Sequence, residues 1–244
     1  MKNHLLTLTL LFMSSFGFAQ TSKEIDSTAI FILDKMSAVI GDLESVNFHL
    51  SSSNDKFNED KDIIKEYHES NISFSGPDKL HIRVNGSDED IAYWYDGSFI
   101  TYYNYNENNY VTLEAPETTL EMIDDMHDHY NFQFPAADFF YPAFTDDLIE
   151  AFDSIKYLGK KTTKGEDCYH IQAINKDLNV QIWVSTQPNV LPKHFVITYK
   201  NQSNLQYEST FSNWSLNPRI PDSKFHFLAP PNAKLISILK KGDS

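Results

Sequence analysis

The fold is decided by residues 80–113, which read LHIRVNGSDEDIAYWYDGSFITYYNYNENNYVTL. Residues 80–84 alternate apolar and polar side chains, the two-residue period of a β-strand that buries one face. The aromatic run Ile91–Tyr95 then leads into Asp96-Gly97, a dipeptide typical of a tight hairpin turn. Two further apolar runs follow, separated by a polar tip. The stretch therefore predicts an antiparallel meander with aromatic-rich faces.

The regions on either side extend this sheet and add a helix. Apolar residues recur at three- and four-residue spacing over Ser27–Ile40, which predicts an amphipathic helix that ends before Gly41. Alternating or β-compatible runs predict further strands. These are Val46–Leu50, Ile63–Phe74, Ile155–Leu158, Cys168–Ile174, Val180–Val184, Phe195–Tyr199 and Leu205–Trp214. Strands at intervals of about ten residues suit a meander sheet or an open barrel.

Residues 116–153 interrupt the strand pattern. Thr118 and Thr119 can cap a helix, and a second short helix is expected near Asp146–Phe152. Between them lies a segment rich in phenylalanine and proline. Long inserts of this kind are more often covers or binding elements than scaffold, so we expect a helical lid here. We predict one domain over residues 20–244.

The N-terminal segment has the features of an export signal. Lys2 is followed by a short apolar run, and Gly17 and Ala19 occupy the small-residue positions of a cleavage site. The run is too short to span a bilayer, and the residue directly after Ala19 is Gln20 and not a cysteine that could carry a lipid. We therefore expect cleavage after Ala19 and a periplasmic protein without a lipid anchor.

Composition excludes several function classes. The chain has 244 residues and a formal net charge of -14, which argues against binding to nucleic acid. No GxGxxG or GxxxxGK[ST] loop is present to cradle a nucleotide phosphate. The single cysteine, Cys168, rules out an internal disulfide framework.

The order of these elements resembles the LolA/LolB-like lipoprotein carriers of the bacterial periplasm, and more closely an uncharacterised family of predicted periplasmic proteins allied to them. The resemblance rests on three motifs in order: Gly76-Pro77-Asp78-Lys79-Leu80, the hairpin Trp94–Gly97, and Phe225–Ala233. It implies an α+β fold: a strongly curved antiparallel sheet forming an incomplete barrel, with an N-terminal helix and a helical lid. In the carriers the hollow between sheet and lid holds acyl chains. The carriers also have a basic residue before the turn proline, whereas this chain has Gly76, so that gating role is not carried over.

An aromatic and aliphatic set on the meander and the insert is the candidate lining of such a hollow. The same residues also fit an ordinary packed core, since every half-buried sheet shows a period-two apolar face. The set from the strands is Leu80, Ile82, Val84, Tyr93, Tyr95, Ile100, Tyr102 and Val111, and the set from the insert is Met122, Ile123, Met126, Phe139, Phe140 and Leu148.

Catalytic and metal-binding motifs are weak. In a helix, Asp124 would share a face with His127 and Asp125 with His129, a spacing that could ligate Zn²⁺. A zinc site needs three or four ligands, and a solvated acidic helix face explains the cluster as well. Cys168 alternates with His170 on one strand without a third group to orient a base, so a structural thiol is expected. We assign no catalytic residue, metal or cofactor.

Together these observations predict a monomeric, non-enzymatic carrier or binding protein for a lipid, a lipoprotein acyl chain or another hydrophobic ligand. Transient contact with a membrane or a membrane protein would accompany that role. Two alternatives stay open: a sensory or protein-interaction domain built on the same half-barrel, and a metal-dependent enzyme centred on His127 and His129.

Overall fold

A computed structural model describes residues 23–241. The expected export signal and its cleavage site lie outside this range. The helices are α1 (Ser27–Gly41), α2 (Thr119–Tyr130) and α3 (Phe144–Ala151), with the short 3-10 helices η1 (Ala137–Phe140) and η2 (Asp222–Phe225). The strands are β1 (Glu24–Ile25), β2 (Ser45–Phe57), β3 (Ile63–Ser75), β4 (Lys79–Gly86), β5 (Asp90–Tyr95), β6 (Phe99–Asn104), β7 (Asn109–Glu114), β8 (Ser154–Thr163), β9 (Glu166–Ile174), β10 (Leu178–Ser185), β11 (Pro192–Tyr199), β12 (Leu205–Leu216) and β13 (Lys234–Leu235).

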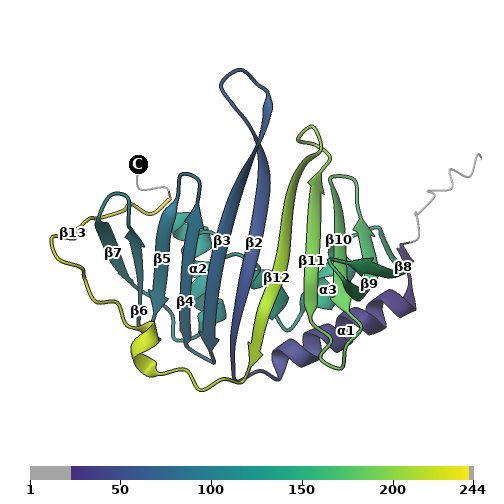
Figure 1. The fold of residues 1–244 in the computed structure, drawn as a ribbon, viewed down its shortest axis with the longest axis horizontal. Coiled ribbons are helices and arrows are strands. Elements are labelled where there is room, and N and C mark those ends of the chain that lie inside the picture. The colour runs from purple at the N-terminus through teal and green to yellow at the C-terminus, as the bar shows by residue number, and fades with distance from the viewer. Residues whose placement is uncertain (1–22, 242–244) are drawn as a thin grey trace, which may run out of the picture.

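All the described strands belong to one curved sheet that does not close (Figure 1). The strand order is β1-β8-β9-β10-β11-β12-β2-β3-β4-β5-β6-β7-β13. Only the short edge strands β1 and β13 pair in parallel; every other pair is antiparallel. The pairing of β12 with β2 joins the last long strand to the first. The predicted α+β class with an open antiparallel sheet is therefore confirmed.

The register places the predicted apolar residues of the meander on one face. Ile82 pairs with Tyr93, Tyr93 with Tyr102, and Tyr102 with Val111. On the other side of the same row, Ile82 pairs with Ile72 of β3. Directly opposed side chains on one face of an antiparallel sheet are in contact distance. The result is an apolar row that runs across five strands.

The three helices lie on one side of this sheet, behind it in the view of Figure 1. Of the apolar stripe predicted for α1, Ala29, Leu33, Met36 and Ile40 are buried and Ile30 is only half-buried. The helix also buries Ile32. Asp26 begins this helix and ties it to the sheet, because its carboxylate accepts from the backbone N–H of Thr28 at 2.7 Å and of Tyr157 at 3.3 Å. These contacts fix the helix against β8.

Two local features differ from the predictions. The β5–β6 turn is centred on Gly97-Ser98 instead of Asp96-Gly97, because Tyr95 pairs with Ile100 and the carboxylate of Asp96 accepts from the N–H of Phe99. The β2–β3 hairpin is longer than expected. Its outer part extends beyond Asn54 and His68, the last residues that pair with β12 and β4.

Candidate ligand-binding site

The insert, residues 116–153, forms α2, η1 and α3 on the helical side of the sheet. The Thr118 hydroxyl accepts from the backbone N–H of Glu121 and donates to its carboxylate at 2.8 Å, a reciprocal cap that begins α2. Met122 and Met126 are fully buried beneath this helix. Asn131 ends it in the left-handed conformation, with φ 61°. The helical content expected for the insert is present.

The aromatic side chains of η1 fill the middle of the concave face. Phe139 is 4% exposed, and its ring centroid lies 5.0 Å from that of Phe144 and 5.3 Å from those of Phe195 and Phe211. Phe140 points to the other half of the sheet, where it stacks on Phe48 at 5.8 Å. Such offset or edge-on aromatic contacts stabilise beyond the area they bury.

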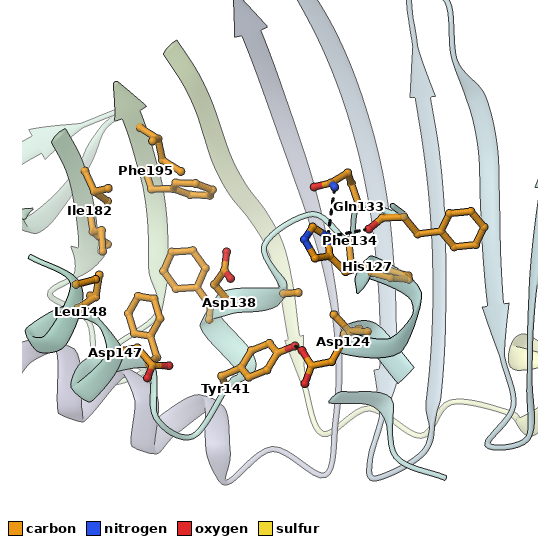
Figure 2. Close-up of a pocket in the computed structure, with 18 of the residues that line it drawn as sticks. Asp124, His127, Gln133, Phe134, Asp138, Tyr141, Asp147, Leu148, Ile182 and Phe195 are labelled. Carbon is orange, nitrogen blue, oxygen red and sulfur yellow. Dashed lines mark hydrogen bonds between the residues drawn. The ribbon is translucent and has the colours of Figure 1, made fainter. Parts of the chain in front are cut away.

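Two sizeable cavities remain beside this aromatic centre. The first cavity, shown in Figure 2, has a volume of about 680 Å³ and lies between the insert and strands β10 and β11. The second cavity has a volume of about 560 Å³ and extends toward β2–β5 and β12. Both are lined in part by the same residues, so they adjoin. The shared lining is Phe132, Gln133, Phe134, Asp138, Phe195 and Ile197. A third space of about 30 Å³ separates Phe140 from β4.

The wall of the first cavity that the strands form is apolar, and the charged groups of this cavity come from the insert. Figure 2 shows Ile182 and Phe195 opposite Asp124, Asp138 and Asp147. The Tyr141 hydroxyl donates to Asp124 at 2.6 Å. Partial burial, and then the carboxylate of Asp124, raise the pKa of Tyr141, so the phenol stays protonated.

Asp138 lies where the two cavities adjoin. The surrounding protein atoms raise the pKa of its carboxyl, and its own backbone N–H and the nearby His127 offset this in part. The His127 ring is held by the carbonyl of Phe132 and the side-chain amide of Gln133, each 3.4 Å from its Nδ1. The polar side of the site is therefore ordered by contacts within the insert.

The structure separates the fourteen predicted lining residues into two groups. Ile123, Phe139 and Leu148 line the first cavity, Val84, Tyr93 and Tyr102 line the second, and Leu80, Ile82, Ile123 and Phe140 line the third space. Tyr95, Ile100, Val111, Met122 and Met126 line none of them. These five are 3% exposed or less, and the Tyr95 hydroxyl donates to the carbonyl of Pro116 at 2.5 Å. They form a packed core because α2 lies directly over that part of the sheet.

The residues that the sequence argument missed come from the other half of the sheet and from the loop after α2. Val180 and Ile182 of β10 and Phe195 and Ile197 of β11 form one wall of the first cavity. Val180 and Ile182 alternate with polar residues in the sequence, whereas Phe195 and Ile197 belong to a continuous apolar run; both patterns are typical of strands with a buried face. Periodicity does not say which buried face lies opposite an insert, and that pairing depends on long-range packing.

The geometry gives little support to either chemistry considered from the sequence, a zinc site at His127 and His129 or a nucleophilic Cys168. His129 contacts Asp125 at 2.9 Å, whereas His127 lines the first cavity. Within residues 23–241, no group of three or more His, Cys, Asp or Glu side chains is arranged to hold a metal ion. Cys168 is fully buried, and burial raises the pKa of its thiol. His170 instead contacts the Gln181 side chain, at 3.0 Å.

The fold and these cavities define a class of α+β proteins in which helices on one face of an unclosed sheet enclose apolar space. This chain belongs to the DUF2092 family of predicted periplasmic proteins, whose family model matches residues 29–239. That membership confirms the expected resemblance to an uncharacterised family of predicted periplasmic proteins and the periplasmic location expected from the sequence. No helix within residues 23–241 has both the length and the hydropathy needed to cross a membrane.

Individual relatives are distant. The uncharacterized protein MJ0687 of Methanocaldococcus jannaschii is 24% identical over 169 residues, which is 68% of this chain but only 42% of that protein. An uncharacterized conserved protein from Thermus thermophilus has a TM-score of 0.50 at 9% identity over 86% of this chain and 98% of its own, which shows a shared fold. A LolA superfamily protein from Nitrosomonas europaea matches with a TM-score of 0.37 at 12% identity, over 82% and 97% of the two chains.

Proposed function

We propose that this protein binds or carries a hydrophobic ligand, such as a lipid or an acyl chain, in the periplasm without enzymatic chemistry. The observation that carries the proposal is the pair of adjoining cavities, of about 680 and 560 Å³, beneath the insert. Ligand sites in proteins are typically apolar clefts of about 300–1,000 Å³ with a few polar groups. Both cavities fall in that range of volume. The strand wall of the first cavity is apolar, whereas the second cavity adds polar side chains such as Ser52, Asn54 and Ser70 to its apolar lining.

The energetics of such binding are sufficient. Burial of a methylene group contributes about 0.8 kcal/mol, so a chain of about sixteen carbons contributes on the order of 10 kcal/mol before ordering costs. Phe134, Phe195 and Ile197 are in place to contact such a chain in either cavity. No covalent step is needed.

We assign the insert the role of a lid. Phe139 and Phe140 hold its centre on the sheet through aromatic contacts, so displacement of η1 would join the two cavities. A ligand chain would then replace contacts that these rings make with the sheet. Lipoprotein transport itself is not part of the proposal, because Gly76 stands where the carriers have a basic residue.

The test is to fill the shared cavity wall with one large side chain. Ile197→Trp places an indole where both cavities meet, whereas Val196→Trp puts the same group on the opposite face of β11. We expect Ile197→Trp to weaken binding of dodecanol, measured by calorimetry, about tenfold or more, and Val196→Trp to leave it within about twofold. Absence of dodecanol binding by the wild-type protein, together with absence of lipid in its extracts by mass spectrometry, would refute the proposal.

The single-domain organisation and the monomeric state remain predictions, as does transient membrane contact. The pairing of β12 with β2, which makes both halves of the chain one sheet, supports a single domain. A protein-interaction domain would be favoured by a concave face filled entirely by its own side chains. Phe139 fills only the middle of that face, and the space on both sides favours a ligand.

A further inference from the structure

The charge of the cavity walls narrows the ligand class. Asp124, Asp128, Asp138 and Asp147 line the first cavity, and Glu89 with the shared Asp138 lines the second. No lysine or arginine is among the residues that line either cavity. A fatty acid or a phospholipid would bring its anionic group among these carboxylates, and like charges at close range repel.

The carboxylates of the first cavity are also not neutralised from outside it. None of its four aspartates forms an ion pair with a lysine or an arginine of the described residues. Three lysines do reach the insert, but none of them pairs with these aspartates. Lys23 donates to the carbonyl of Ile149 at 2.7 Å, Lys241 donates to that of His127 at 3.0 Å, and Nζ of Lys240 lies 5.9 Å from the ring centroid of Tyr130. Negative charge beside an apolar wall therefore stays available to a ligand.

The geometry points to an amphiphile with a cationic head group, such as an amine, and an apolar tail as the ligand of this site. This inference rests on the proposed function. The tail would lie against Ile182 and Phe195 of the strands, and the cation would lie beside one of the exposed carboxylates of the insert, those of Asp124, Asp138 and Asp147 (Figure 2). Both walls of the cavity then meet a complementary part of one molecule.

Asp138 has a particular place in this arrangement. It lines both cavities, so a cation bound beside it can direct the tail into either one. The Asp138 side chain is exposed, but the protein atoms around it disfavour its charged form and raise its pKa. A bound cation would reverse that effect, because an opposite charge nearby favours the carboxylate.

The test compares three probes that share one chain and differ in head group: dodecylamine, which is cationic at neutral pH, dodecanol and dodecanoate. We expect dodecylamine to bind about tenfold or more tightly than dodecanoate, the effect of one charge-assisted hydrogen bond. Asp124→Asn, Asp138→Asn and Asp147→Asn combined should abolish this preference, with dodecanol as the uncharged reference probe.

The matched control removes the same number of charges from exposed positions away from the cavities, with Glu59→Gln, Asp60→Asn and Glu107→Gln. This variant should keep the wild-type preference. Equal loss in both variants would attribute the preference to net charge and overturn the inference, as would dodecanoate binding as tightly as dodecylamine. Failure of all three probes to bind would instead refute the proposed function itself.

Discussion

Replacement of Phe139 by alanine tests the packing and the binding argument at once. The Phe139 ring is 4% exposed and contacts the rings of Phe144, Phe195 and Phe211 at centroid distances of 5.0 to 5.3 Å. Truncation of a buried phenylalanine to alanine costs about 3–5 kcal/mol of unfolding free energy. In a chain of this size about 1 kcal/mol corresponds to roughly 2–4 °C in the melting temperature. We expect a decrease of roughly 6–20 °C in the absence of ligand.

The space vacated by Phe139 should be usable by a ligand. Phe139 lines the first cavity, so its removal enlarges that cavity, and an added alkyl chain can restore part of the lost contact. Saturating dodecanol should therefore raise the melting temperature of Phe139→Ala more than that of the wild-type protein. Mass action sets the size of the effect, about 2.7 kcal/mol at a ligand concentration one hundred times the dissociation constant.

Phe152→Ala is the matched control for this prediction. Phe152 is also 4% exposed, yet it lines none of the three spaces. The two variants should be destabilised to a similar extent, and only Phe139→Ala should show the additional rescue by dodecanol. Equal rescue of both variants, or a loss of less than about 1 kcal/mol in Phe139→Ala, would show that Phe139 does not fill the centre of a ligand cavity.

Two further predictions concern the fold. Burial, and then two nearby cations, lower the pKa of His81 from 6.5 to about 4. Between these two pH values the unfolded chain binds a proton at His81 that the folded chain does not bind, so the free energy of unfolding decreases as the pH falls from 6.5 toward 4. The decrease is about 2 kcal/mol between roughly pH 7 and roughly pH 5. Urea unfolding of His81→Phe should show that much less pH dependence than the wild-type protein, and an unchanged slope would contradict the burial argument. Gly97 has φ +95°, and a Cβ there would lie 2.6 Å from the Asp78 carboxylate, so Gly97→Ala should cost about 1–3 kcal/mol. Gly165→Ala, with φ +83° and open space around the Cβ position, should cost less, and equal losses in thermal unfolding would show that the Asp78 contact is unimportant.

The strands and helices were predictable because their signals are local. Leu80, Ile82 and Val84 alternate in the sequence and lie on one face of β4 in the structure. The helical insert was predictable from Thr118 as a cap and from the loss of alternation after it. The turn at Gly97 was misplaced by one residue, because the choice between neighbouring turn positions depends on how the strands pair.

The lining of the cavities was only partly predictable. Tyr93 and Tyr102 line the second cavity, whereas Tyr95 and Ile100, on the same strands and the same face, are packed. The difference comes from where α2 lies over the sheet, which no periodicity records. The wall made by Phe195 and Ile197 was missed for the same reason, since their partners in the insert are about 60 residues away in the chain.

The α+β class, the strands, the helical insert and the expectation of export all followed from local sequence patterns, because each depends on the spacing of neighbouring residues. The tertiary structure alone decided that β12 pairs with β2, that Phe139 fills the centre of the concave face, and that space remains on both sides of it. It also decided that four aspartates and no lysine or arginine border the first cavity. These features arise from contacts between residues far apart in the chain, where shape and volume decide the outcome and local pattern does not.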